Sequence, residues 1–311
     1  MPTRELDRGF TVHTFALPPA GFDARKASTR DLAGYGIPAR PDDAHLRERW
    51  ERALARPFQM VQPRFRTRQR THQKLPAGLA PPAAPLPSPM RTNYIGGASV
   101  TSTPAQGDVR WIEGTFTLPN TYWPVGGSST DYPFSTWIGI TGDPAGSSLL
   151  AGWDSYVYST GHALQRSYYV WWRWYPGDTQ YISNFIVEPG DTLSMVACLD
   201  LGSHVRARVT FQNLSTTQAT TFAVTAPGGS ELQANTASWM VSNDVVDFEG
   251  PFIARFGEMY VDECNAGTTD SPGILHPSQR IFLTDFDNPD QDVVVSNLLS
   301  DTLMQMRYVG S

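Results

Sequence analysis

The chain has 311 residues, enough for one large β domain with an extension or for two modest domains. No apolar run reaches the roughly 18 residues that a membrane helix needs. The first ten residues, MPTRELDRGF, lack the apolar region of a secretory signal. These features favour a cytoplasmic protein that does not enter a membrane.

The net charge of −6 is divided unevenly along the chain. Residues 1–91 contain 16 Lys and Arg against 8 Asp and Glu, whereas residues 92–311 contain 8 Arg, no Lys and 22 Asp and Glu. An acidic body without lysine argues against a nucleic-acid partner, and the basic part carries no recognisable nucleic-acid module. We therefore expect the basic arm to dock on the acidic domain of its own chain.

The first predicted unit, residues 1–91, is a basic arm with two short helices and a Pro/Ala-rich linker. Ser28 followed by Asp31 forms a capping-box pattern that begins the first helix. The second helix lies in PDDAHLRERWERALARP, where Leu46, Trp50 and Leu54 form one narrow apolar stripe. Such a stripe cannot make a core alone, so this helix is expected to pack on the β domain.

Two further stretches complete the arm. RFRTRQRTHQK, residues 64–74, is a basic run that is typical of a solvated linker. LPAGLAPPAAPLPSP, residues 75–89, has the composition of an extended, semi-rigid spacer. The boundary to the second unit is expected near residue 91.

Residues 92–311 are predicted to be all-β. Short apolar runs such as STWIGITG, TLSMVACLD and RIFLTDFD are separated by Gly, Pro, Asn and Asp turns. HVRARVTFQ alternates apolar and polar residues without interruption. Many short strands at this spacing predict a two-sheet antiparallel β-sandwich.

A series of motifs in this domain is more specific. They occur in one order: NYIGGA (93–98), WIGITGD (137–143), LLAGWD (149–154), YYVWWRWYPG (168–177), VEPGD (187–191), VTFQNLSTTQ (209–218) and ASWMVS (237–242). Together they resemble the eqolisins, the glutamic peptidases of family G1, also called peptidase A4. The resemblance implies a concanavalin-like sandwich of two bent antiparallel sheets with a substrate groove on the concave side.

The resemblance also implies a particular chemistry. In this family a Glu acts as general base on water and later as an acid, while a Gln amide holds the water and stabilises the oxyanion. The fungal members are made with a basic propeptide ahead of an acidic mature domain, and the charge division of this chain is similar. This N-terminal arm is not obviously a removable propeptide.

Both catalytic positions are substituted when the motifs are carried over. The family's Gln position corresponds to Leu150, and both Glu positions of the AEWIVE stretch are serine, Ser238 and Ser242, so that the dyad is read as Leu150 and Ser242. Thr141 stands where Asp is usual, and Arg173 where Glu is usual. Leucine can neither donate nor accept a hydrogen bond, and serine is no base near neutral or acid pH.

Strand parity places these substitutions on the inferred groove faces. Aromatic rings along a concave sheet suit sugar faces, peptide side chains or an apolar small molecule, and Arg173 would favour a carboxylate or phosphate. Trp172 and Trp174 have the opposite parity and are expected in the core. The predicted groove residues are Trp137, Thr141, Leu150, Trp153, Asp154, Trp171, Arg173, Tyr175, Ser238, Met240 and Ser242.

Other constellations are weaker. TDFDNPDQD places Asp285, Asp287, Asp290 and Asp292 close enough to chelate Ca²⁺, yet the stretch lacks the Gly and terminal Glu of an EF-hand loop and favours a solvated turn. Cys198 and Cys264 have no metal-ligand spacing, and no cofactor is expected. Cys264 would pair with His204 or His276 only if folding joined them, and His162 is expected in a loop. Glu113 is expected on a strand surface.

Three functions remain open from the sequence. The first is an eqolisin-like protein without peptidase activity, whose aromatic groove binds a peptide, sugar or small acid or carries a different reaction. The second is an active acid endopeptidase whose catalytic pair lies elsewhere. The third is a biosynthetic enzyme of unrelated chemistry that uses the same groove, with Arg173 as anion anchor.

Overall fold

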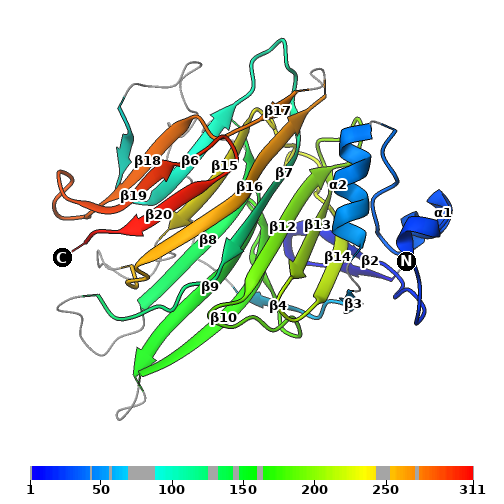
Figure 1. The fold of residues 1–311 in the computed structure, drawn as a ribbon, viewed down its shortest axis with the longest axis horizontal. Coiled ribbons are helices and arrows are strands. Elements are labelled where there is room, and N and C mark those ends of the chain that lie inside the picture. Colours follow the sequence, from blue (N-terminus) through cyan, green and yellow to red (C-terminus); the bar gives the residue numbers. More distant parts are fainter. Residues whose placement is uncertain are drawn as a thin grey trace.

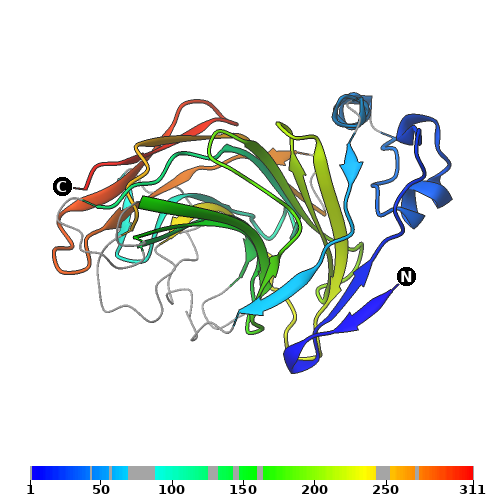
Figure 2. The same ribbon diagram turned by 90° about the horizontal axis from the view of Figure 1, so that it is seen from below.

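The computed structural model describes residues 2–42, 44–55, 58–68, 88–124, 132–142, 147–159, 164–242, 253–269 and 273–310. The strands within these ranges form one continuous hydrogen-bonded sheet that doubles back into two packed, bent layers (Figure 1, Figure 2). The predicted antiparallel sandwich is confirmed. None of the helices in the described ranges is long and apolar enough to cross a bilayer.

The first layer begins at one edge with a strand of the N-terminal arm and runs through successive antiparallel neighbours. Its order is β1 (Thr3–Glu5), β2 (Thr11–Thr14), β14 (Gln218–Thr225), β13 (Arg206–Asn213), β12 (Thr192–Leu199), β7 (Val109–Thr117), β16 (Glu258–Thr268) and β20 (Met304–Tyr308). Alternation along β12 follows the sequence pattern, since Leu193, Met195 and Ala197 are fully buried while the residues between them are half-buried.

The second layer carries most of the motif residues. Its order is β18 (Gln279–Thr284), β6 (Ile95–Thr101), β15 (Thr236–Ser242), β8 (Tyr132–Thr141), β9 (Leu149–Ser159), β10 (Leu164–Trp174), β11 (Thr179–Ile182) and β4 (Phe65–Arg68). The layers join through β19 (Asp292–Leu298), which pairs with both β18 and β20. Short strands border them, namely β3 (Gln59–Met60), β5 (Met90–Thr92) and β17 (Ile274–Leu275).

The core lies between the two layers and is dominated by tryptophan. Trp153, Trp172, Trp174 and Trp239 are all at most 1 % exposed. Trp172 and Trp174 come from β10, and their burial confirms the expectation that they belong to the core. Aromatic side chains of this size fill a thick interlayer space and contribute much of its apolar burial.

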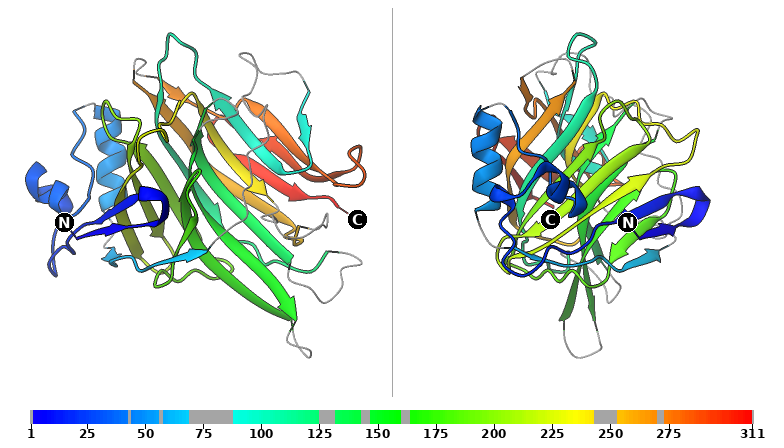
Figure 3. Two further views of the ribbon diagram at one scale, coloured as in Figure 1. Left: turned by 180° about the vertical axis from the view of Figure 1, so that it is seen from behind. Right: turned by 90° about the vertical axis from the view of Figure 1, so that its right-hand side faces the viewer.

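The N-terminal elements gather at one end of the sandwich, while the C-terminus lies at the other (Figure 1, Figure 3). They comprise β1 (Thr3–Glu5), the 3-10 turns η1 (Asp7–Gly9) and η2 (Ala24–Lys26), and the helices α1 (Thr29–Gly34) and α2 (Ala44–Leu54). The Ser28 side chain accepts from the backbone N–H of Asp31 at 3.1 Å, so the predicted helix cap forms.

Two expectations for this arm were wrong. Trp50 and Leu54 of the α2 stripe pack within the arm, in a small cluster with Ala24 and Leu32 that is separate from the sandwich core. Residues 65–68 form a strand and not a solvated linker. The side chain of Phe65 is buried in the main core and holds this strand against the sandwich, although most of the surrounding residues are polar or basic. Residues 69–87 lie outside the described residues.

Both thiols are predicted to be unreactive in the native protein. Burial raises the pKa of Cys198 to about 11 and raises the pKa of Cys264 as well. Near pH 8 the thiolate, which is the reactive form, is thus roughly a hundredfold scarcer at Cys198 than at a free cysteine. A chromogenic disulfide reagent at pH 8 should label neither residue in water within minutes and both in 6 M guanidinium. Rapid labelling of the native protein would contradict this.

Candidate functional site

Four strands of the second layer bring the predicted site positions onto one face. β15 pairs with β8, β8 with β9, and β9 with β10. Residues in register on neighbouring strands point to the same side of a sheet. We call the side that carries Trp137, Leu150, Trp171 and Met240 the Trp137 face. The other side of the same strands packs into the core.

The first row on the Trp137 face contains Leu150, which the sequence motifs predict to stand at the family's glutamine position. Ser238 is in register with Gly139, Gly139 with Leu150, and Leu150 with Arg173. A Cβ atom added at Gly139 would lie 2.6 Å from Leu150 Cδ2. The Leu150 side chain therefore leans over Gly139, into the gap that separates it from Ser238.

Ser242 belongs to a different row. It is in register with Ser135, which is in register with Asp154. Trp137 Nε1 donates a hydrogen bond to Ser242 Oγ at 3.3 Å. The strand register thus places Ser238, and not Ser242, opposite Leu150. The sequence motifs alone had led to Ser242 as the partner of Leu150 in the predicted pair.

The middle of the face is apolar and closed. Gly152 stands between Trp137 and Trp171, where an added Cβ would lie 2.8 Å from Trp137 Cβ and 2.9 Å from Trp171 Cζ2. Only glycine leaves room for both indole rings at this point. The cluster formed here consists of Ile95, Trp137, Leu150, Trp171, Tyr181, Met240 and Ile281, each at most 9 % exposed.

A fully buried carboxylate, Asp154, anchors one side of this cluster. Its Oδ1 accepts from the Ser135 hydroxyl and from Trp171 Nε1, the latter at 2.6 Å. Its Oδ2 accepts from the hydroxyls of Tyr181 at 2.5 Å and Tyr156 at 3.2 Å. Two bonds to each oxygen fill the acceptor positions of a carboxylate, so Asp154 holds these rings in place.

The N-terminal arm reaches this network. The Arg68 guanidinium donates to the Tyr156 hydroxyl and stacks over the same ring, 5.0 Å from its centroid. The Tyr156 and Tyr181 hydroxyls are 3.2 Å apart. A chain of polar contacts therefore runs from β4 of the arm to Asp154.

Arg173 is less accessible to a ligand anion than its position in the sequence indicated. Its side chain is 6 % exposed, Nε donates to the Gly177 carbonyl at 3.0 Å, and the guanidinium lies 5.4 Å from the centroid of the half-buried Tyr175 ring. A buried guanidinium in this setting braces the turn after β10.

One predicted groove residue was wrong. Trp153 has the opposite parity to Leu150 and Asp154 and is fully buried in the core, where it lies 5.3 Å from Phe134 and 6.0 Å from Tyr168, ring centre to ring centre. Strict alternation along LLAGWD would have excluded it. Thr141 lies half-buried at the end of β8, in register with Thr236.

The acidic turn of residues 285–292 forms local contacts. Asp285 accepts from the backbone N–H groups of Asp287 and Asn288, and Asp292 forms an ion pair with Arg91 at 2.9 Å. Within the described ranges, no three acidic, His or Cys side chains are grouped to hold a metal.

The remaining candidates also have local partners. Glu113 accepts from Asn265 Nδ2 at 2.9 Å, but this acid–amide pair lies on β7 and β16 of the first layer. Cys264 Sγ contacts the Val261 carbonyl, whereas His204 contacts Asp108 and the Leu232 carbonyl. His162 lies outside the described residues.

The fold resembles scytalido-glutamic peptidase, in its crystal structure with a transition state analog inhibitor, with a TM-score of 0.56 at 21 % identity over 71 % of this chain and all of that chain. A second structure of that peptidase, with a peptide-based analog, gives 0.52 at 20 % over the same shares. The class of fold is that of the glutamic peptidases.

The family follows from the sequence match. The model of the Peptidase A4 family matches residues 93–308, so the chain belongs to this family. Aspergillopepsin-2 of Aspergillus niger is 27 % identical over 190 residues, which are 60 % of this chain and 64 % of that protein. The chain thus matches somewhat less than two thirds of this relative's length.

The Asp154 network predicts a large effect on stability. Asp154→Ala leaves Trp171 Nε1 and the buried hydroxyls around it without their acceptor, and should lower the free energy of unfolding by roughly 3–5 kcal/mol. Urea denaturation measures this. Asp287→Ala, at an exposed turn, is the control and should change it by less than about 0.5 kcal/mol. Equal midpoints for the two variants would show that the network contributes nothing.

Proposed function

We propose that this member of the Peptidase A4 family lacks glutamic peptidase activity and that its Trp137 face serves ligand binding. The observation that carries the proposal is the pair of side chains at the mapped catalytic positions. Leu150 offers no donor for an oxyanion or a water, and neither Ser238 nor Ser242 offers a base. Loss of a general base typically costs about 10²–10⁴ in rate, and loss of an oxyanion donor about 10²–10³.

The row formed by Leu150, Gly139 and Ser238 supports this reading. Neighbouring strands are about 4.8 Å apart, so side chains on either side of a glycine can meet above it. A glutamine at Leu150 and a glutamate at Ser238 would meet in this way. We therefore assign the lost pair to Leu150 and Ser238, in place of Leu150 and Ser242.

Other groups on the face do not replace the missing base. Asp154 is the carboxylate in register with Ser135 and Ser242, but both of its oxygens accept two hydrogen bonds from side chains of the fold. A general base needs an oxygen within reach of the substrate water. Asp154 is fully buried, and its role is to accept hydrogen bonds from neighbouring side chains.

The ligand class follows from what lines the face. Indole and thioether groups suit an extended peptide, a sugar ring or an apolar small molecule. The lining side chains are at most 9 % exposed, so a ligand reaches them only when neighbouring groups move. We expect a ligand to raise the melting temperature by the mass-action effect of binding to the folded state.

The absence of proteolysis is directly testable. The purified chain, incubated with an unfolded protein from pH 2 to 7, should leave the substrate intact because no base activates water. The double variant Leu150→Gln, Ser238→Glu should gain cleavage at acid pH, and each single change should gain far less because the pair acts as a unit.

The matched control for that test is Leu150→Gln with Ser242→Glu, which places the carboxyl in the wrong row. Cleavage by the unaltered chain would overturn the proposal, and cleavage that survives Leu150→Ala, Ser238→Ala and Ser242→Ala would place the peptidase chemistry elsewhere. Gel electrophoresis and mass spectrometry of the fragments distinguish these results.

Binding is tested by a thermal-shift screen with peptides, sugars and small acids. A ligand of the Trp137 face should raise the melting temperature of the unaltered chain and not that of Trp171→Phe, where the indole is lost but an aromatic ring remains. Tyr260→Phe, on the exposed surface of β16, is the control and should retain the shift. A small acid that is consumed on incubation would instead favour a biosynthetic reaction.

A further inference from the structure

The N-terminal segment, residues 2–68, lies entirely outside the part of the chain that matches the family model, which begins at residue 93. We propose that this segment is a permanent part of the folded protein, which stays bound even when the connection to the sandwich is cut. The segment occupies one edge of each layer. The proposal therefore concerns an interface within one chain and does not depend on the proposed function.

The first attachment is to the edge of the first layer. β2 pairs antiparallel with β14, with Val12 in register with Val224 and Thr14 with Phe222. Val12 is 1 % exposed and belongs to the main core. Without β2 the backbone groups along β14 would form an open sheet edge, which invites pairing with other chains.

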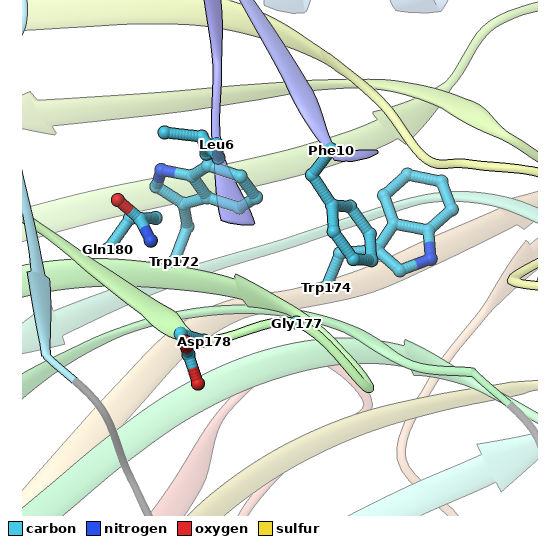
Figure 4. A pocket seen from close by; sticks show the side chains of 7 residues that line it. All are labelled: Leu6, Phe10, Trp172, Trp174, Gly177, Asp178 and Gln180. Carbon is cyan, nitrogen blue, oxygen red and sulfur yellow. The ribbon is translucent and has the colours of Figure 1, made fainter. Parts of the chain in front are cut away.

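The turn between β1 and β2 closes the end of the core (Figure 4). Leu6 and Phe10 lie above Trp172 and Trp174, and together with neighbouring residues they line a small pocket that is partly open to solvent. Phe10 is 3 % exposed and packs so closely on Gly177 that an added Cβ there would lie 2.8 Å from its ring. Removal of the segment would expose both indoles.

The second attachment is to the edge of the second layer. β4 pairs antiparallel with β11, with Phe65 in register with Ile182. The Phe65 ring lies edge-on to Trp172 at 6.3 Å and to Phe222 at 5.0 Å between ring centroids. Trp172 is on β10 of the second layer and Phe222 on β14 of the first. Phe65 therefore sits between the two layers where their edges meet.

Polar contacts fix these strands in place. Arg4 donates to the Phe65 carbonyl at 3.1 Å, which joins the hairpin to β4. Arg8 donates to the Pro176 carbonyl at 3.0 Å, and Asn184 Nδ2 donates to the Gln62 carbonyl at 2.9 Å. Their acceptors are backbone carbonyls, so these contacts require one register and do not depend on the net charge of the sandwich.

The two attachments act together to hold the segment on the sandwich. A removable segment would leave a stable body behind, with its own edges and core covered. Here departure of the segment opens the edges of β14 and β11 and uncovers Trp172 and Phe222 at once. The basic segment and the acidic sandwich resemble a propeptide and a mature domain in charge. The interface between them nevertheless does not have the properties of one that separates.

The test cuts the connection after folding. A specific protease site is placed within residues 69–87 of the full chain, the purified protein is cleaved, and the products are separated by native gel filtration. We expect one peak that contains both pieces, with a melting temperature within a few degrees of the uncut protein. Separation of the pieces under native conditions, whether or not the larger piece stays folded, overturns the proposal.

Paired variants show which contacts retain the segment. Phe65→Ala should release the cleaved segment at a lower urea concentration than the unaltered chain, because the side chain between the layers is lost. Arg66→Ala, the exposed neighbour on the same strand, should release it at the unaltered concentration. The pair Val12→Ala and Thr11→Ala repeats the comparison on β2. Equal release by Phe65→Ala and Arg66→Ala would overturn the assignment of Phe65 as the anchor.

Discussion

In-register pairing of β15, β8, β9 and β10 decides which side chains meet on the second layer. A shift by one residue would exchange the Trp137 face for the core side along a whole strand. The register is held by burial, because the tryptophans of the opposite parity fill the space between the layers. The register also explains the positions of Gly139 and Gly152. An added Cβ atom at either position would lie too close to a large side chain on a neighbouring strand.

The same register brings two of the mapped positions together, because Ser238 and Leu150 face each other across Gly139. In the assignment that we propose, a base and an amide are therefore missing from one place. The cluster on this face is apolar, and Asp154 at its side accepts hydrogen bonds from Ser135, Trp171, Tyr156 and Tyr181. A carboxylate with four donors stabilises the aromatic side chains around it and has no capacity left for a substrate water.

The arm shows how a segment outside the family's common region becomes integral to its fold. Strand pairing gives it two edges to occupy, and Phe65 makes contact with both layers where those edges approach. Its arginines donate to backbone carbonyls and to the Tyr156 hydroxyl, which links the arm to the Asp154 network. The arm thus covers an edge of each layer, closes one end of the core and contacts the network that supports the Trp137 face.

Local patterns in the sequence were sufficient to predict the sandwich, the family and the core positions of Trp172 and Trp174, because alternation and ordered motifs are local signals. The motifs also led to Leu150 and the two serines as the residues at the predicted catalytic positions. Three features became visible only in the folded chain: Ser238 faces Leu150, Trp153 lies in the core, and residues 65–68 form an edge strand. All three features depend on which strands become neighbours and in what register they pair. Pairing and register depend on the total burial of side chains in both layers, and no short stretch of sequence contains that information.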